Sequence, residues 1–152
     1  MYLKKYLKQY KNKQIKHFID MDGVIADYIF GSAKDYDLKR PLKSNIKKLK
    51  KISKLKNVEL FIFSATRMSE GFNQKNSWLN KYAPFFKNEN RIIISREAND
   101  MKESSALKAE YLSKYPKDDS LIIVIDDDPK NLKAIHQVDC DIVLLKDTVL
   151  VD

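Results

Sequence analysis

Residues 17–28 read HFIDMDGVIADY, and within them an apolar run ends at two carboxylates. These are Asp20 and Asp22, and Gly23 follows at once. Apolar residues that end in an Asp-Gly pair are typical of a strand that leads into a turn. The stretch therefore predicts a buried strand over residues 16–21 whose carboxyl end carries acidic side chains.

Four further apolar runs follow along the chain: VELFIFS (58–64), RIIIS (91–95), LIIVI (121–125) and DIVLL (141–145). Apolar residues recur at helical spacing over 2–14, 42–55, 70–82, 101–115 and 129–138. Near-continuous apolar runs are typical of strands that are buried on both faces, as in a parallel sheet. The sequence therefore predicts an α/β fold, a three-layer Rossmann-like parallel five-stranded sheet with helices on both faces.

The size and composition of the chain fit one globular domain over residues 1–152, with 43% hydrophobic residues and an N-terminal helix over about 2–14. The longest apolar run is far shorter than the roughly 20 residues of a transmembrane helix, so no membrane partner is expected. The first sixteen residues lack the apolar core of a signal peptide, and Cys140 is the only cysteine. Both features favour a cytoplasmic location.

The net charge of +8 favours anionic partners such as phosphates or nucleic acid. Only four of the 29 basic residues are arginines: Arg40, Arg67, Arg91 and Arg96. Nucleic-acid surfaces commonly combine arginine with aromatic residues, and no such clustering is visible here. We therefore interpret most of the positive charge as a lysine-rich, solvated surface.

Ligands of parallel α/β sheets bind beyond the carboxyl ends of the strands, so the residues that follow each strand are the candidates for chemistry. These residues include Asp20, Asp22, Gly23, Ser64, Ala65, Thr66, Arg67, Asp126 and Asp127. Several carboxylates facing one crevice repel one another and need a cation. Oxygen ligands suit Mg²⁺, and His17, His136 and Cys140 are too scattered in sequence to form a zinc site.

Glycine occurs only at positions 23, 31 and 71, which excludes several common nucleotide sites. The sequence contains neither a GxxxxGK[ST] phosphate-binding loop nor a GxGxxG dinucleotide turn. It also lacks the GxSxG nucleophile elbow of serine hydrolases. The acidic residues at the strand ends are therefore the main candidates for a functional site.

Three segments in this order, FIDMDGV, FIFSATR and IVIDDDPKN, with a lysine-bearing helix before the last, resemble the haloacid dehalogenase (HAD) superfamily. Most members of that superfamily are Mg²⁺-dependent phosphatases. DMDGVIADY is most similar to the deoxyribonucleotidase-type branch, and SATR with DDDPKN is similar to the 3′-phosphatase domains of polynucleotide kinases. Only about a dozen residues separate Tyr28 from Pro41, so no substantial cap is expected and an open site would admit larger substrates.

The resemblance implies a role for each matching residue. Asp20 would be the nucleophile that forms an aspartyl-phosphate, and Asp22 would be a general acid with an elevated pKa. Gly23 would let the backbone approach the phosphate, and Ser64, ranked above Thr66, would donate to a phosphoryl oxygen. Asp20, the backbone carbonyl of Asp22, Asp126 and Asp127 would hold Mg²⁺.

A lysine of the helix before the last acidic segment would neutralise the phosphate, and two candidates remain. Lys108 lies 19 residues before Asp127 and Lys102 lies 25 before it, and the shorter spacing favours Lys108. Ala65 and Arg67 are further candidates for contacts with the substrate. Asp27 is interpreted as structural and Asp128 as the N-cap of the helix that Pro129 begins.

The sequence thus predicts a Mg²⁺-dependent phosphomonoesterase whose substrate is a small phosphorylated molecule, a nucleotide or the phosphorylated end of a nucleic acid. Two alternatives are a phosphoacceptor domain of the receiver type and a regulatory or nucleic-acid-binding protein that retains the site without turnover. Receiver domains carry the acidic pair first and the acceptor aspartate in mid-chain, which is the reverse of the order found here.

Overall fold

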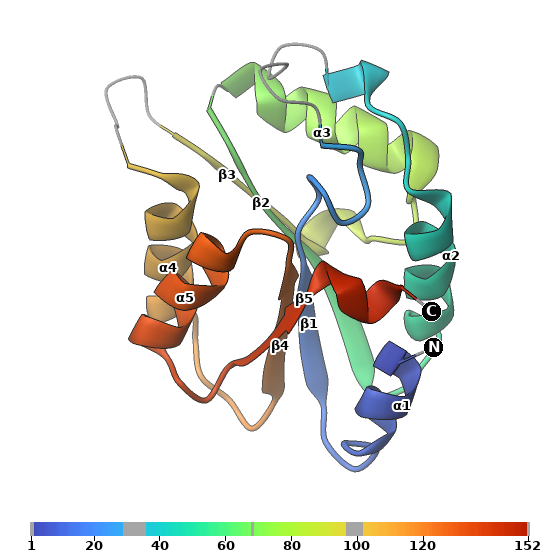
Figure 1. The fold of residues 1–152 in the computed structure, drawn as a ribbon, viewed down its shortest axis with the longest axis vertical. Coiled ribbons are helices and arrows are strands. Elements are labelled where there is room, and N and C mark those ends of the chain that lie inside the picture. Colours follow the sequence, from blue (N-terminus) through green and yellow to red (C-terminus); the bar gives the residue numbers. More distant parts are fainter. Residues whose placement is uncertain (1, 29–35, 68, 97–101, 152) are drawn as a thin grey trace.

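The sheet has five parallel strands, as predicted, and the structure places them in the order β3-β2-β1-β4-β5 (Figure 1). They are β1 (Ile15–Ile19), β2 (Val58–Thr66), β3 (Arg91–Ser95), β4 (Leu121–Asp126) and β5 (Val143–Lys146). The structure is a computed structural model that describes residues 2–28, 36–67, 69–96 and 102–151. Because Ile19 pairs with both Ile62 and Ile125, the carboxyl ends of β1, β2 and β4 lie side by side, where the strand order reverses.

Helices cover both faces of this sheet (Figure 1). One face carries α1 (Tyr2–Lys8), α2 (Lys43–Ile52) and α3 (Ser69–Tyr82), and the other carries α4 (Ser104–Ser113) and α5 (Pro129–Val138). Successive residues of a strand point to opposite faces, so Leu60 and Ile62 pack in the first layer while Phe61 and Phe63 pack in the second. This double burial is the reason that the strands read as continuous apolar runs.

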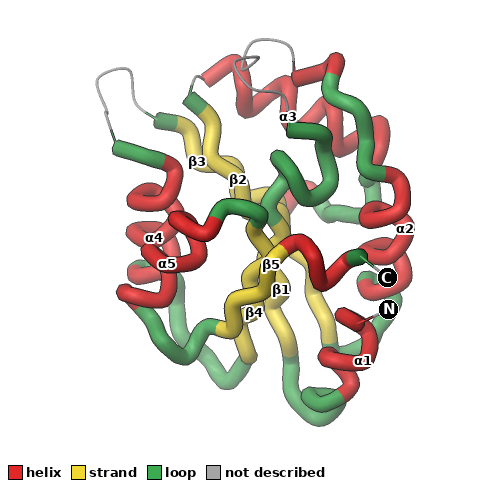
Figure 2. The backbone as a smooth tube through the Cα atoms, in the orientation of Figure 1, coloured by secondary structure: helices red, strands yellow, loops and turns green. Residues whose placement is uncertain are grey.

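The described part of the chain also contains three short 3₁₀ helices: η1 (Tyr36–Leu38), η2 (Asn88–Asn90) and η3 (Asp147–Leu150). Loops follow the carboxyl ends of β1 and β4 at the same edge of the sheet (Figure 2). The Asp128 side chain accepts a hydrogen bond from the backbone N–H of Lys130 at 2.9 Å, which confirms Asp128 as the N-cap of α5.

Most of the expected elements shift by one to three residues at an end, as β1 (Ile15–Ile19 against 16–21) and α2 (Lys43–Ile52 against 42–55) show, and α1 and β5 differ for a visible reason. Helix α1 ends at Lys8 rather than near residue 14, because the Asn57 side chain donates to the carbonyls of Tyr10 and Lys13 and holds that segment in turns. Strand β5 spans Val143–Lys146 rather than 141–145. The backbone N–H of Asp141 bonds to the Asp139 side chain at 3.0 Å, which forms a turn where the strand was expected to begin.

The expected loop over 28–41 is described only in part, since residues 29–35 lie outside the described residues. The part that follows packs on α3: the backbone N–H of Tyr36 bonds to Gln74, and the Trp78 indole donates to the Lys39 carbonyl at 3.0 Å. Asp27 Oδ2 accepts a hydrogen bond from Arg40 Nε at 3.0 Å and forms an ion pair with Arg40 Nη2 at 2.9 Å. Asp27 therefore ties the two ends of this segment together.

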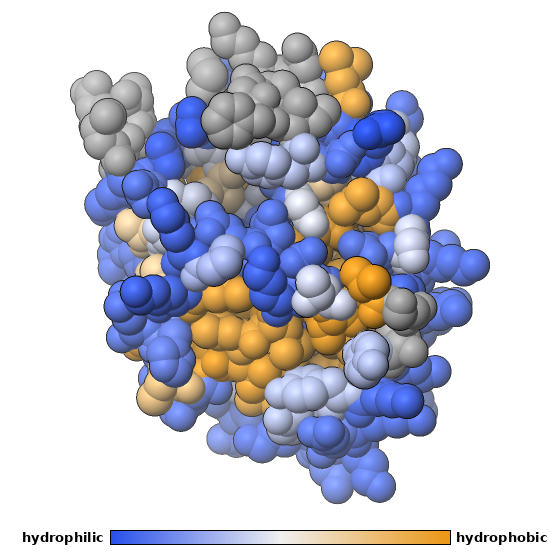
Figure 3. All heavy atoms as spheres, in the orientation of Figure 1, coloured by the Kyte–Doolittle hydropathy of each residue, from blue (hydrophilic) through white to orange (hydrophobic). Residues whose placement is uncertain are grey.

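On the surface shown in Figure 3, apolar side chains gather over the edge strand β5, and hydrophilic side chains surround them. The residues Val143, Leu144 and Leu145 are partly buried against the two core clusters. Within the described part of the chain, none of the helices combines the length and apolar character that a membrane crossing requires.

Candidate active site

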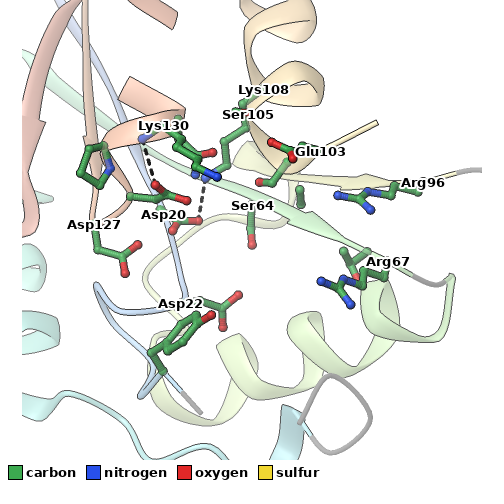
Figure 4. A pocket seen from close by; sticks show the side chains of 17 residues that line it. Asp20, Asp22, Ser64, Arg67, Arg96, Glu103, Ser105, Lys108, Asp127 and Lys130 are labelled. Carbon is green, nitrogen blue, oxygen red and sulfur yellow. Dashed lines mark hydrogen bonds and ion pairs between the residues drawn. The ribbon is translucent and has the colours of Figure 1, made fainter. Parts of the chain in front are cut away.

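A pocket of about 640 Å³ lies at the carboxyl ends of β1, β2 and β4, at the predicted edge of the sheet (Figure 4). Among the predicted site residues, those that line it are Asp20, Asp22, Ser64, Ala65, Arg67, Lys108 and Asp127. Gly23 lies directly beside Asp127, and Asp126 is fully buried at the end of β4. The fold therefore brings all nine predicted site residues to one place.

Lys108 is the lysine that reaches the acidic strand ends. Its ammonium donates to Asp20 Oδ1 at 2.9 Å and to Asp126 Oδ2 at 2.6 Å, and the side chain is only 1% exposed. Lys102, the alternative candidate, is exposed and pairs with Glu110 at 3.0 Å. Helix α4 thus places Lys108 rather than Lys102 beside the predicted nucleophile.

Asp126 and Asp127 are adjacent in sequence but differ in their surroundings. The Asp126 carboxylate accepts bonds from Lys108, from the Asn131 amide at 3.0 and 3.1 Å, and from the Asp128 backbone N–H at 2.9 Å. Asp127 is half-buried and turns toward the pocket (Figure 4). Asp126 therefore fixes the end of β4 and the lysine, while Asp127 offers its carboxylate to the pocket.

One carboxylate oxygen from each of Asp20, Asp126 and Asp127 lies within 4.8 Å of the other two. Three hard oxygen donors at this separation fit a small divalent cation such as Mg²⁺. Burial raises the pKa of Asp20 to about 8, an effect that outweighs the lowering by Lys108 and that Asp126 and Asp22 reinforce. Burial and the charge of Asp126 raise the pKa of Asp127 to about 6. Excess negative charge is concentrated here, and a cation would relieve it.

Gly23 is required by the shape of this site for two reasons. Its φ is +76°, a conformation that side-chain-bearing residues rarely adopt. A Cβ at this position would also clash with the Asp127 carboxylate. Glycine therefore lets the turn after β1 pass directly beside the Asp127 carboxylate.

Asp22 does not belong to this group of three carboxylates and is held by two lysines. Lys39 donates to its Oδ1 at 2.6 Å and Lys75 to its Oδ2 at 3.3 Å. Burial favours a higher pKa, but the charges of Lys75 and Lys39 outweigh it and lower the pKa of Asp22 below its usual value. This direction corrects the expectation of an elevated pKa, because the two lysines were not expected beside Asp22.

The residues at the end of β2 form the opposite wall of the pocket (Figure 4). Ser64 is buried, and its hydroxyl lies 2.6 Å from the ammonium of Lys75. The Ala65 carbonyl accepts a bond from the same ammonium at 2.8 Å, so its polar contact is to the protein. Arg67 is exposed at the rim, and Thr66 also lines the pocket beside Gly71.

Lys75 and Lys39, which contact Asp22, were not predicted as site residues from the sequence. Lys75 lies three residues before Trp78 and four before Leu79 in α3, so all three side chains are on the buried face of the helix. A lysine among apolar residues on one helix face could have indicated a buried charge. Lys39 gave no signal of its own, because its burial depends on how the segment after Tyr36 packs on α3. In a chain with so many lysines, neither stands out by residue type.

A scan of the sequence against protein-family models finds no match, and a search of curated proteins finds no relative. The fold, however, is similar to solved structures. A chain of the Pnkp1/Rnl/Hen1 RNA repair complex superimposes with a TM-score of 0.66 at 13% identity, over 89% of this chain and 42% of that chain. This chain thus spans less than half the length of that neighbour.

Two further neighbours match most of their own length. The D,D-heptose 1.7-bisphosphate phosphatase from B. bronchiseptica, solved with magnesium and phosphate, gives a TM-score of 0.58 at 13% identity, covering 88% of this chain and 79% of that chain. The HAD domain of effector protein Lem4 from Legionella pneumophila gives 0.57 at 14% identity, covering 88% and 85%. The chain therefore has the fold of the HAD superfamily, as the sequence resemblance implies.

Proposed function

We propose that this chain is a Mg²⁺-dependent phosphomonoester hydrolase that acts through an aspartyl-phosphate on Asp20. The observation that carries the proposal is the convergence of Asp20, Ser64 and Lys108 on one pocket with Asp127 beside them. A carboxylate, a hydroxyl donor and an ammonium around one cavity are the groups that phosphoryl transfer needs. The phosphatase among the neighbours of similar fold supports the same class of reaction.

In this proposal an oxygen of Asp20 attacks phosphorus, and the bond from phosphorus to the leaving oxygen breaks. Asp22 gives a proton to that oxygen and then accepts one from the water that hydrolyses the aspartyl-phosphate. Its resting ion pairs imply that Asp22 takes up a proton only as substrate binds. Ser64 and Lys108 bind phosphoryl oxygens, and Lys108 lies close enough to Asp20 to hold its carboxylate in position.

Asp20, Asp126 and Asp127 would hold Mg²⁺ together with the Asp22 backbone carbonyl. When bound, the ion supplies positive charge that lets an anionic nucleophile approach an anionic phosphate. The donor set supports this choice, because the three grouped ligand atoms are all carboxylate oxygens.

We further propose that the substrate is the phosphorylated end of a nucleic acid. Arg67, Arg96 and Lys130 line the pocket, and Tyr28, which also lines it, is 62% exposed. Basic side chains can contact neighbouring phosphates, and an exposed aromatic ring can stack on a base. A chain of an RNA repair complex is among the structures of similar fold, which agrees with this substrate class.

The test compares three substrates with and without Mg²⁺: a generic aryl phosphate, a 3′-mononucleotide and a 3′-phosphorylated oligonucleotide. We expect chelation to abolish hydrolysis of all three, and the oligonucleotide to give the highest kcat/KM. Arg67→Ala with Arg96→Ala should raise the KM for the oligonucleotide while leaving the aryl phosphate unaffected, because only the longer substrate reaches the rim. Metal-independent turnover would contradict the hydrolase proposal, and equal or better turnover of mononucleotides would contradict the nucleic-acid substrate.

A phosphoacceptor without turnover makes a different prediction. Such a protein would take up one phosphoryl group from a small donor and retain it, with no steady release of phosphate. Continuous phosphate release over many turnovers therefore separates the proposed function from this alternative.

A further inference from the structure

Lys75 is a second buried lysine at the candidate site, and it reaches the site from the face of the sheet opposite to Lys108. The side chain is 3% exposed and is not part of the pocket lining. Its ammonium contacts Ser64 Oγ at 2.6 Å, the Ala65 carbonyl at 2.8 Å and Asp22 Oδ2 at 3.3 Å. An ammonium has three N–H donors, so these contacts use all of them.

The contact with Ser64 decides what the serine hydroxyl can do. A lysine ammonium can only donate, so Ser64 Oγ must accept through a lone pair. A hydroxyl has one hydrogen, and this hydrogen is left to donate to a different group. Ser64 lines the pocket, so a phosphoryl oxygen there is a ready acceptor. Lys75 thus orients Ser64 so that its hydroxyl can donate a hydrogen bond into the pocket.

The contact with Asp22 fixes the carboxylate from its other side. Lys39 takes one carboxylate oxygen and Lys75 takes the other, so the plane of the group is set by two ammoniums. Both ammoniums also lie over the ring of Tyr36, at 4.6 and 5.1 Å from its centroid. This ring stabilises two like charges that are held close together.

We propose that Lys75 is a positioning residue that orients the Ser64 hydroxyl toward the substrate's phosphoryl group and holds the Asp22 carboxylate for proton transfer. The inference rests on the proposed hydrolase function, and it adds a residue that never touches the substrate. Lys75 acts through Ser64 in binding and through Asp22 in turnover. Lys39, which contacts Asp22 and not Ser64, acts in turnover alone.

The experiment measures binding of inorganic phosphate by calorimetry in the presence of Mg²⁺, together with kcat for an aryl phosphate. We expect Lys75→Met to raise the dissociation constant of phosphate about tenfold and to lower kcat by about a hundredfold. Lys39→Met should lower kcat and leave the dissociation constant of phosphate within twofold of the wild-type value. A merely structural role for Lys75 would not produce this split between the two lysines.

A double-mutant cycle with Ser64→Ala isolates the contribution through the serine. In the Ser64→Ala background, Lys75→Met should change the dissociation constant of phosphate less than twofold, because the hydroxyl that it orients is absent. The same factor in both backgrounds, or unchanged phosphate binding in Lys75→Met, would overturn the proposal. If Lys75→Met does not fold, Lys75→Gln replaces it in the double-mutant cycle. Glutamine removes the charge of the lysine but keeps a polar group at the buried position.

The outcomes also separate this inference from the proposed function. Wild-type protein that binds phosphate but hydrolyses no phosphomonoester contradicts the hydrolase proposal, while the binding cycle still decides the role of Lys75 toward Ser64. Wild-type protein that neither binds phosphate nor hydrolyses esters contradicts both.

Discussion

The ammonium of Lys108 donates to Asp20 at 2.9 Å, although 88 positions separate the two residues in sequence. The contact joins a helix on one face of the sheet to the residue that follows the central strand. The same ammonium reaches Asp126 at 2.6 Å, so one buried cation serves two carboxylates. This arrangement leaves an excess of negative charge beside Asp127, which is the basis for expecting a divalent cation there.

Replacing Lys108 by methionine should abolish activity and destabilise the fold. The substitution leaves Asp20 and the fully buried Asp126 without their cation, and breaking a buried ion pair costs about 3–5 kcal/mol. The free energy of unfolding in urea and the kcat/KM for an aryl phosphate are the two measurements. Lys102→Met, on the same segment but exposed, is the control and should keep kcat/KM within twofold of the wild type. Equal losses of kcat/KM in the two variants would contradict a role for Lys108 at the site.

Replacing Asp127 by asparagine should weaken Mg²⁺ binding by about 10–100-fold, because the substitution removes a charged oxygen ligand from the pocket. Calorimetric titration with Mg²⁺ in the absence of substrate measures this directly. Asp128→Asn is the matched control, since asparagine also caps a helix and the Asp128 side chain bonds to the backbone of α5. If Asp128→Asn weakened Mg²⁺ binding as much as Asp127→Asn, the assignment of Asp127 to the cation site would be wrong.

Stability should fall as the pH drops from about 6.5 to about 4, and His17 should account for part of this fall. Burial lowers the pKa of His17 to about 4, against which its hydrogen bond to the Ile123 carbonyl acts only weakly. The unfolded chain therefore takes up the proton at a higher pH than the folded chain does, so acid favours unfolding. The loss reaches about 3 kcal/mol once the pH is below both pKa values.

His17→Phe removes this titration and serves as the comparison in urea unfolding at several pH values. Carboxylates also lose stabilising contacts in acid, so the quantity of interest is the difference between the two proteins. This difference should change between pH 6.5 and 4 and stay constant above pH 7. Parallel curves for the two proteins would show that His17 does not titrate in this range.

Much of the fold follows from local patterns. The five strands were predicted because each reads as an apolar run with acidic, serine or turn residues at its end. The central strands β1, β2 and β4 read so because they are covered on both faces. The carboxyl ends of parallel strands lie at the same edge of a sheet, and this places Ser64 and Asp126 at the site. Their positions could therefore be predicted without knowing how the helices pack. Lys108 was favoured over Lys102 by the spacing that the superfamily resemblance implies, and its contacts with Asp20 and Asp126 decide between the two.

The parts that escaped prediction depend on contacts between distant segments. Helix α1 stops early because the Asn57 side chain bonds to the carbonyls that follow it. The state of Asp22 depends on Lys39 and Lys75, which belong to a loop and a helix whose docking the sequence does not specify. A resemblance to a superfamily predicts roles only for the residues that match its motifs. Lys39 and Lys75 lie between those motifs, so the resemblance predicts nothing about them.

The most direct test of the account is to trap the phosphorylated protein. Wild-type protein mixed with a radiolabelled phosphomonoester and Mg²⁺ and quenched in acid should carry a label that hydroxylamine releases, as an acyl phosphate does. Proteolysis should place that label on the peptide with Asp20, and Asp20→Asn should show neither label nor turnover. Undiminished hydrolysis by Asp20→Asn, or a label on another residue, would contradict the assignment of Asp20 as the nucleophile.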